Sequence, residues 1–246
     1  MERREYETMA AVEQTHWWFV ARRAIIGAVL KRFVPQHKTP LDILEVGCGS
    51  GGNLSMLSAY GTVYGAEYDA TAREKAVERG VAKEVAACEL PSKPAFAGQT
   101  FDLILMLDVL EHIKDDQVTL DVLARQLKED GMLLMTVPAF QWLWSQHDVQ
   151  CHHQRRYTAP QLRDLIHKAG LQQRYVSYFN FWLFPLVALM RLAQRWGVGH
   201  SKATSDLKTP NMLVNAVLKG IFGSERMLVP RFRMPWGLSV MALATR

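Results

Sequence analysis

The stretch from residue 43 to residue 53, ILEVGCGSGGN, constrains the fold more than any other part of the chain. Apolar residues at its start are typical of a short buried strand, and helix-like sequence resumes at Leu54. The glycines between them allow positive φ and let a ligand approach the backbone without a Cβ in the way. A strand, a glycine turn and a helix N-terminus in this order predict a nucleotide-type binding corner. The glycines are Gly47, Gly49, Gly51 and Gly52.

Two kinds of cofactor use such a corner. Gly47, Gly49 and Gly52 fit the dinucleotide pattern G-x-G-x-x-G, and Glu67 lies 20 residues after Gly47, as in NAD sites. An NAD-dependent oxidoreductase is therefore one alternative. Glu45 counts against a dinucleotide, because a dianionic pyrophosphate gains nothing from a carboxylate beside it.

The 246-residue chain is long enough for one α/β domain with additions, and no repeat or Gly/Ser linker divides it. Its three cysteines are odd in number and far apart, which is typical of a reducing cytosol. The charged N-terminal residues lack the apolar stretch of a signal peptide. We therefore expect a single-domain cytoplasmic protein.

Strand-like and helix-like segments alternate along the chain, which predicts an α/β fold with a doubly wound, mostly parallel sheet. After the first strand, further strands are expected at 62–67, 84–87, 100–107 and 132–137. Helices are expected at 2–33, 70–79 and 115–128, and another begins near residue 158.

Three motifs carry a family resemblance: EVGCGSG at 45–51, FDLILMLDVLEHI at 101–113 and LKEDGMLLMTVP at 127–138. With them the chain resembles the class I S-adenosylmethionine (SAM) methyltransferases of types 11, 12 and 23, strongly over residues 40–140. The resemblance implies a seven-stranded Rossmann-like sheet. The final strand, 237–244, would insert antiparallel at the sheet edge.

Other segments resemble a narrower subgroup associated with bacterial surface-glycan, lipid and polyketide pathways. These segments are HWWF at 16–19, WSQHD at 144–148 and HQRRYT at 153–158. The resemblance divides the single domain, 1–246, into a helical lid that folds over the cofactor, a SAM-binding core, an acceptor-side loop with a helical insertion, and the last strand. Their ranges are 1–34, 40–140, 141–235 and 236–246.

The resemblance also implies roles for cofactor-binding residues, with S-adenosylhomocysteine as the product. Glu45 would lie near the cationic methionine end, and Glu67 would accept hydrogen bonds from the ribose hydroxyls. Tyr68 would lie against adenine. We expect SAM to be bound by Glu45, Gly47, Gly49, Glu67, Tyr68, Leu90 and Asp108.

We expect the methyl group to be transferred to an oxygen atom of the acceptor, which requires a base or a metal ion. Asp108, Glu111 and His112 share one face at helical spacing, and they resemble the metal-binding Glu-x-x-Glu-His of quinone-precursor O-methyltransferases. The alternative, which we favour, is that Glu111 and His112 pin the loop while Asp108 lies near SAM. A divalent metal is therefore an open but less favoured cofactor.

The loop after the fifth strand holds a second cluster of ionisable residues, at the edge of the sheet where acceptors bind in open α/β folds. His153 follows Asp148 by five residues, and an imidazole is well suited to act as a general base near neutral pH. We expect His153 to be the leading catalytic candidate, with His147 and His112 after it. The alternatives are a C- or N-methyltransferase of a natural-product pathway and a non-catalytic SAM-binding scaffold.

The C-terminal part of the chain is basic and contains its most apolar run. Residues 150–246 hold 14 Lys/Arg against 3 Asp/Glu, and 176–196 include an amphipathic helix from about Leu183 to Trp196. This helix either lines an acceptor pocket or lies peripherally on an anionic membrane to reach a lipid-linked acceptor. The Asn/Asp-Pro-Pro-aromatic motif of nucleic-acid methyltransferases is replaced by DVLE at 108–111, so a small-molecule or lipid-linked acceptor is expected rather than nucleic acid. The oligomeric state is left open.

Overall fold

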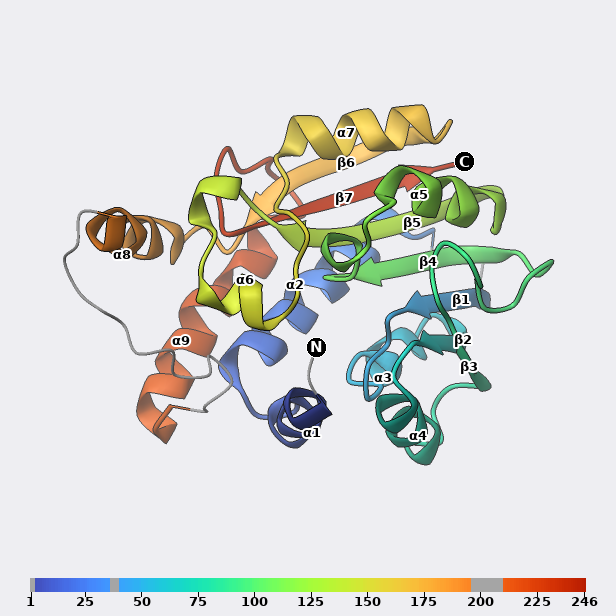
Figure 1. The fold of residues 1–246 in the computed structure, drawn as a ribbon, viewed down its shortest axis with the longest axis horizontal. Coiled ribbons are helices and arrows are strands. Elements are labelled where there is room, and N and C mark those ends of the chain that lie inside the picture. Colours follow the sequence, from blue (N-terminus) through green and yellow to red (C-terminus); the bar gives the residue numbers. More distant parts are fainter. Residues whose placement is uncertain (1–2, 36–39, 196–209) are drawn as a thin grey trace.

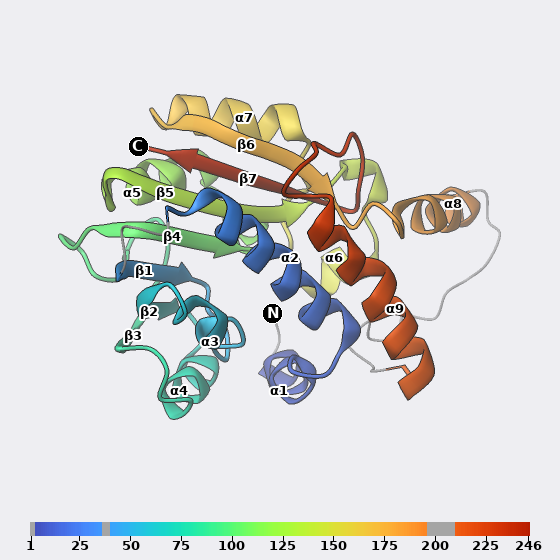
Figure 2. The ribbon, with the colours of Figure 1, turned by 180° about the vertical axis from the view of Figure 1, so that it is seen from behind.

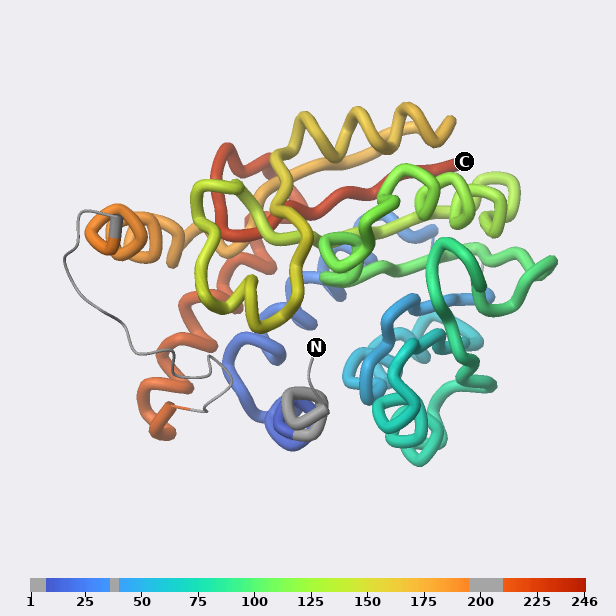
Figure 3. Tube along the Cα trace, in the orientation of Figure 1, coloured from blue at the N-terminus to red at the C-terminus, as the bar shows by residue number. Residues whose placement is uncertain are grey.

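The structure is a computed structural model that describes residues 3–35, 40–195 and 210–246; the remaining residues form the thin grey trace of Figure 1. The expected helix end at Trp196 and part of the acceptor-side segment therefore lie outside the described residues. Figure 3 traces the chain from the N-terminal helices into the sheet and back out to α8 and α9.

Seven strands form one mixed sheet, as the sequence predicts. They are β1 (Leu41–Val46), β2 (Gly61–Glu67), β3 (Glu84–Ala87), β4 (Phe101–Leu107), β5 (Leu127–Pro138), β6 (Gln172–Phe179) and β7 (Ser239–Thr245), in the order β3-β2-β1-β4-β5-β7-β6. The pairs from β3 to β5 are parallel, whereas β7 runs antiparallel to both of its neighbours. The ligand-binding ends of β1, β2, β4 and β5 therefore meet at one edge, where parallel strands present their carboxyl ends.

Two details of the predicted sheet are wrong. The last strand does not lie at the edge, because β7 inserts between β5 and β6 and pairs with both. The edge strand β6 was not predicted, since its first three residues are polar and exposed and its second half merges with the apolar run at 176–196. Only Tyr175 to Phe179 of β6 are buried.

The N-terminal segment forms two helices, α1 (Arg3–Val12) and α2 (Trp17–Phe33), instead of the single helix expected over 2–33. The break has a local cause. His16 has extended backbone dihedrals and its side chain accepts a hydrogen bond from the backbone N–H of Trp18, so it caps the start of α2. The chain turns at His16, and α1 can lie beside the carboxyl ends of the strands.

Helices cover both faces of the sheet (Figures 1 and 2). One core packs beneath α5 (Asp116–Arg125) and α7 (Ala159–Lys168), and the other beneath α2 and α9 (Met212–Ser224). The helix expected at 115–128 ends at Arg125, because β5 begins at Leu127. The other helices are α3 (Leu54–Leu57), α4 (Ala70–Glu78), α6 (Gln146–Gln150) and α8 (Phe184–Arg195), and short 3₁₀ turns cover Leu110–His112, Gln141–Leu143 and Glu225–Met227.

Two side chains fix α9 to distant parts of the chain. The amide of Asn215 in α9 accepts from the backbone N–H of Trp17 at 2.8 Å and donates to the carbonyl of Thr15 at 3.0 Å. The buried Glu225, just after α9, accepts from the backbone N–H groups of Asn180 and Trp182 at 2.6 and 3.1 Å. These bonds join α9 to the N-terminal helices and to the turn that leads into α8.

Within the described ranges, every helix is too short or too polar to cross a membrane.

Candidate active site

The glycine turn after β1 has the backbone that its sequence predicts. Gly47, Gly49 and Gly51 have φ values of 68°, 55° and 83°, a region that favours glycine. A Cβ on Gly47 would lie 2.3 Å from a methyl carbon of Val109, so this position also excludes a side chain for lack of space. The turn therefore brings bare backbone close to the end of β4.

Glu45 is buried in β1 with half of its carboxylate unpaired. One oxygen accepts from the Asn53 amide at 2.7 Å, whereas Oε2 has no hydrogen-bond partner. Burial raises the pKa of Glu45 to about 7. An unpaired buried carboxylate oxygen beside a glycine turn fits a ligand that brings a positive charge.

Glu67 lies at the end of β2 and is also buried, but its carboxylate is bound to the backbone. Its two oxygens accept from the N–H groups of Gly49 and Asp69, at 2.8 and 2.9 Å. Burial raises its pKa. Each oxygen keeps a second lone pair for a ligand. Tyr68 is 72% exposed, and Leu90 packs partly buried against the core.

The N-terminal helices cover the glycine turn, and Glu13 makes the central contact. Its carboxylate accepts from the Ser50 hydroxyl at 2.8 Å and pairs with Arg79. A Cβ on Gly52 would lie 2.1 Å from a Glu13 oxygen. The sequence predicted a helical lid at 1–34 but did not single out Glu13, because a single acid in a charged N-terminal segment carries no signal of its burial.

Asp108 directly follows β4, has a φ of 57° and faces the N-terminal helix α2. Its carboxylate pairs with Arg22 at 2.5 Å and accepts from the Thr136 hydroxyl at 3.1 Å. The guanidinium of Arg22 is buried and lies over the ring of Trp18, 5.0 Å from the ring centroid. The HWWF segment is therefore linked to the end of β4 through Arg22.

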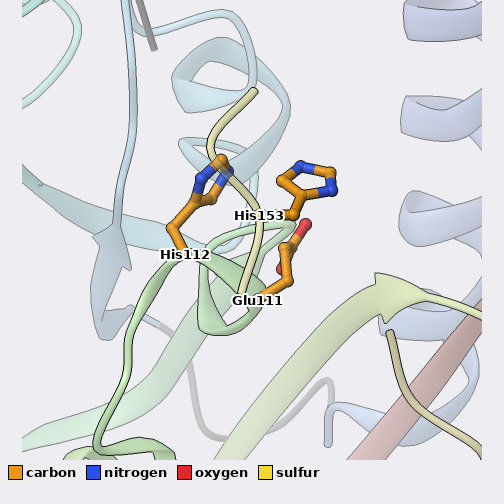
Figure 4. A group of neighbouring side chains, drawn as sticks. All are labelled: Glu111, His112 and His153. Carbon is orange, nitrogen blue, oxygen red and sulfur yellow. The ribbon is translucent and has the colours of Figure 1, made fainter. Parts of the chain in front are cut away.

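Glu111, His112 and His153 form a compact group on the acceptor side (Figure 4). One possible ligand atom from each lies within 4.8 Å of the others, close enough to hold a metal ion. Burial, with the nearby charge of Asp108, raises the pKa of Glu111 well above its ordinary value. Burial and the neighbouring His153 lower the pKa of His112 to about 4, so this imidazole is neutral near pH 7.

This grouping differs from the three residues expected from helical spacing. Residues 110–112 form a 3₁₀ turn rather than an α-helix, and the Asp108 carboxylate is directed at Arg22. His153 takes the third position instead, because the backbone N–H of Gln154 donates to the Glu111 carbonyl at 2.7 Å and joins the two loops.

Asp148 is fully buried and organises the second loop. Its Oδ1 lies 2.9 Å from His153 Nδ1, and both carboxylate oxygens accept from the Arg156 guanidinium, at 2.7 and 2.9 Å. Burial opposes its ionisation, but the hydrogen bonds from His153 and Arg156 lower the pKa of Asp148. The His147 ring centroid lies 6.1 Å from that of His153, and its Nε2 contacts the Cys151 sulfur at 3.6 Å.

Comparisons with known proteins agree with this architecture. The family described as "Methyltransferase domain" matches residues 18–176. A ubiquinone biosynthesis O-methyltransferase of Chelativorans sp. is 35% identical over 100 residues, which cover 39% of either chain. A probable S-adenosylmethionine-dependent methyltransferase of Mycobacterium tuberculosis is 27% identical over 166 residues, covering 66% of this chain and 58% of its relative. The matched segments therefore span 39% and 58% of the two relatives' own length.

Solved structures share the fold at low sequence identity. A phosphoethanolamine N-methyltransferase of Haemonchus contortus, in complex with SAM, has a TM-score of 0.58 at 20% identity and covers 89% of this chain and 51% of its own. A possible histamine N-methyltransferase of Thermotoga maritima has a TM-score of 0.55 at 19% identity. The match covers 93% of this chain and 92% of that protein's chain.

Three observations agree with one another: Glu45 beside the glycine turn, the order of the seven strands with an antiparallel β7, and the family match over most of the core. The chain therefore belongs to the class I S-adenosylmethionine-dependent methyltransferases, and S-adenosylmethionine is its cofactor.

Proposed function

We propose that this enzyme methylates an oxygen atom of a small-molecule or lipid-linked acceptor and that His153 is the general base. When bound, SAM supplies an electrophilic methyl group on a sulfonium sulfur. The protein must then orient the acceptor and accept its proton. The observation that carries the proposal is the 2.9 Å contact between His153 Nδ1 and the buried Asp148 carboxylate.

The Asp148 contact determines which nitrogen of His153 is basic. An ionised carboxylate only accepts hydrogen bonds, and the Arg156 pair with the lowered pKa keeps Asp148 ionised. The proton of neutral His153 therefore resides on Nδ1, and Nε2 keeps its lone pair. After proton transfer from the acceptor, the Asp148 charge would stabilise the imidazolium. His112, neutral beside it, is proposed to orient the acceptor rather than to take the proton.

The cofactor end of the site is proposed to follow the strand ends. Glu45 would face the cationic methionine end through its unpaired oxygen, and Gly47 and Gly49 would line it with backbone. Glu67 would hold the ribose and Asp108 would border the methyl-transfer region. Tyr68 and Leu90 are proposed to flank the adenine.

A divalent ion held by Glu111, His112 and His153 is a second way to activate an acceptor oxygen, since the three ligand atoms lie within 4.8 Å. In that mechanism His153 would be a ligand and could not act as a base. Methyl transfer to carbon or nitrogen is a third route, in which the same histidines would only orient the acceptor.

Replacing His153 with alanine tests the proposed base. Transfer of tritiated methyl from SAM into organic extracts of the source cells should fall by about 10²–10⁴-fold, because general-base catalysis contributes that much. The matched variant His147→Ala should lose less than about tenfold, since the 2.9 Å contact with Asp148 that carries the proposal is made by His153. SAM affinity, measured by calorimetry, should be unchanged in both.

Full methyl transfer by His153→Ala would remove this residue from the mechanism. Loss of wild-type activity on chelation, with recovery on adding Mg²⁺ or Zn²⁺, would instead assign His153 to a metal site. Binding of SAM with no transfer into any extract would favour a non-catalytic scaffold.

A further inference from the structure

Helices α8 and α9 expose large apolar side chains that the proposed reaction does not use. Leu186 and Leu189 of α8 are 60% and 66% exposed, and Met212 and Leu213 of α9 are 88% and 74% exposed. Trp182 before α8 and Trp236 before β7 are each about half exposed. These six residues define what we call the outer face. Figures 1 and 2 show α8 and α9 projecting from the same end of the molecule, away from α3, α4 and α5.

The chain around the outer face is strongly basic. The described residues 182–195 and 210–236 contain 6 Lys/Arg and 1 Asp/Glu. The acid, Glu225, is fully buried and accepts hydrogen bonds from backbone N–H groups, so it offers no surface charge. Arg231 and Arg233 are exposed on either side of the exposed Phe232. Aromatic rings interleaved with arginines are typical of segments that lie at the boundary between water and lipid headgroups.

The outer face connects to the acceptor side of the site through a row of aromatic rings. Phe184, at the start of α8, lies 5.8 Å from Phe140 and 6.0 Å from Trp142, between ring centroids. Both rings belong to the loop after β5, in which Gln141 accepts from the backbone N–H of Arg156 at 3.0 Å. Arg156 in turn holds Asp148, the partner of His153. A chain of contacts, aromatic at α8 and polar further in, therefore links α8 to the residues proposed to activate the acceptor.

We propose that the outer face adsorbs on an anionic lipid surface and that the enzyme takes a lipid-linked acceptor from it. The exposed apolar side chains would enter the headgroup region, and the basic residues would pair with lipid phosphates. A lipid surface explains the basic charge, which a second copy of the same basic face would repel. The identity of the acceptor rests on the proposed function, whereas adsorption does not.

Co-sedimentation of the full chain with vesicles tests adsorption without SAM or methyl transfer. Vesicles of phosphatidylcholine with about one third phosphatidylglycerol should bind the protein at about 0.1 M salt, and higher salt should release it. Pure phosphatidylcholine vesicles should bind it much more weakly. The double variant Leu189→Asp/Leu213→Asp should need at least about tenfold more lipid for half-binding, because it places two acids on the outer face.

The matched control is Val77→Asp/Val118→Asp, which changes exposed residues of α4 and α5 that are 56% and 49% exposed. It should bind vesicles like the wild type, and calorimetry with SAM should show both variants to be folded. Equal binding by the wild type and the outer-face variant would overturn the proposal, as would absence of wild-type binding. A dimer in light scattering that the outer-face variant dissociates would overturn it in favour of a second copy. None of these outcomes bears on His153, whose test needs no vesicles.

Discussion

Replacing Glu45 with glutamine should abolish a pH dependence of SAM binding that the structure predicts. Glu45 is buried with one oxygen unpaired, and burial raises its pKa to about 7 in the ligand-free protein. A cationic ligand next to this oxygen favours the ionised form, so binding is coupled to loss of the proton. Glutamine keeps the shape and the contact with Asn53 but cannot ionise.

The size of the effect follows from the ionised fraction of Glu45. With a pKa of about 7, this fraction is roughly one tenth at pH 6 and more than nine tenths at pH 8. The dissociation constant of SAM should therefore be about tenfold higher at pH 6 than at pH 8, equivalent to about 1.4 kcal/mol. The α-amino group of SAM titrates near pH 8 in both proteins, so the difference between wild type and Glu45→Gln isolates Glu45.

Calorimetric titration of both proteins across this pH range is the assay, with circular dichroism to confirm folding. Equal binding of SAM by the wild type at both pH values would contradict this role of Glu45, as would an unchanged pH dependence in Glu45→Gln. Repeating the titration with S-adenosylhomocysteine locates the contact. The sulfur of S-adenosylhomocysteine is neutral. If the pH dependence of its dissociation constant persists, Glu45 lies near the amino group, and if the pH dependence vanishes, Glu45 lies near the sulfonium of SAM.

Two further predictions concern stability. Gly47→Ala should destabilise the protein by about 2–4 kcal/mol in urea unfolding, because the new Cβ meets both a positive φ and the Val109 side chain at 2.3 Å. Gly80→Ala, with a similar φ of 63° but open space, should cost only about 1 kcal/mol, and equal losses would contradict the steric argument. Burial raises the pKa of Glu225 from 4.5 to about 7, so wild-type stability should fall as the pH rises through this window and level off above it. The free energy of unfolding of Glu225→Gln, relative to that of the wild type, should rise by up to about 3 kcal/mol between pH 4.5 and 7.5. A difference that does not change with pH would disprove the raised pKa of Glu225.

The sequence predicted the central strand β4 because it is a near-continuous apolar run, with Asp102 as its one charged residue, and is covered on both sides. The short strand β3 was also predicted at its observed bounds, although its residues are exposed or only partly buried. β6 was not predicted because its first three residues are exposed and its apolar end runs on towards α8. The position of β7 between β5 and β6 depends on that missing strand. Likewise, the break between α1 and α2 depends on one side-chain cap at His16, which periodicity does not detect.

The candidate site was predictable where one loop carries the partners. Asp148 and His153 lie five residues apart, and their proximity follows from a single short segment. The group in Figure 4 was not predictable, since it joins Glu111 to His153 from another loop through a backbone hydrogen bond. Glu13 was missed for the same reason, because its partners Ser50 and Arg79 are remote in sequence.

The two hydrogen bonds of Asn215 restrict how the cofactor exchanges. The N-terminal helices lie on the glycine turn, and Asn215 ties them to α9 at Thr15 and Trp17. If the N-terminal helices move away from the glycine turn to release product, they either break both bonds or carry α9 along. In the second case, product release would displace the helix that bears Met212 and Leu213, and so would be coupled to the proposed attachment at the outer face.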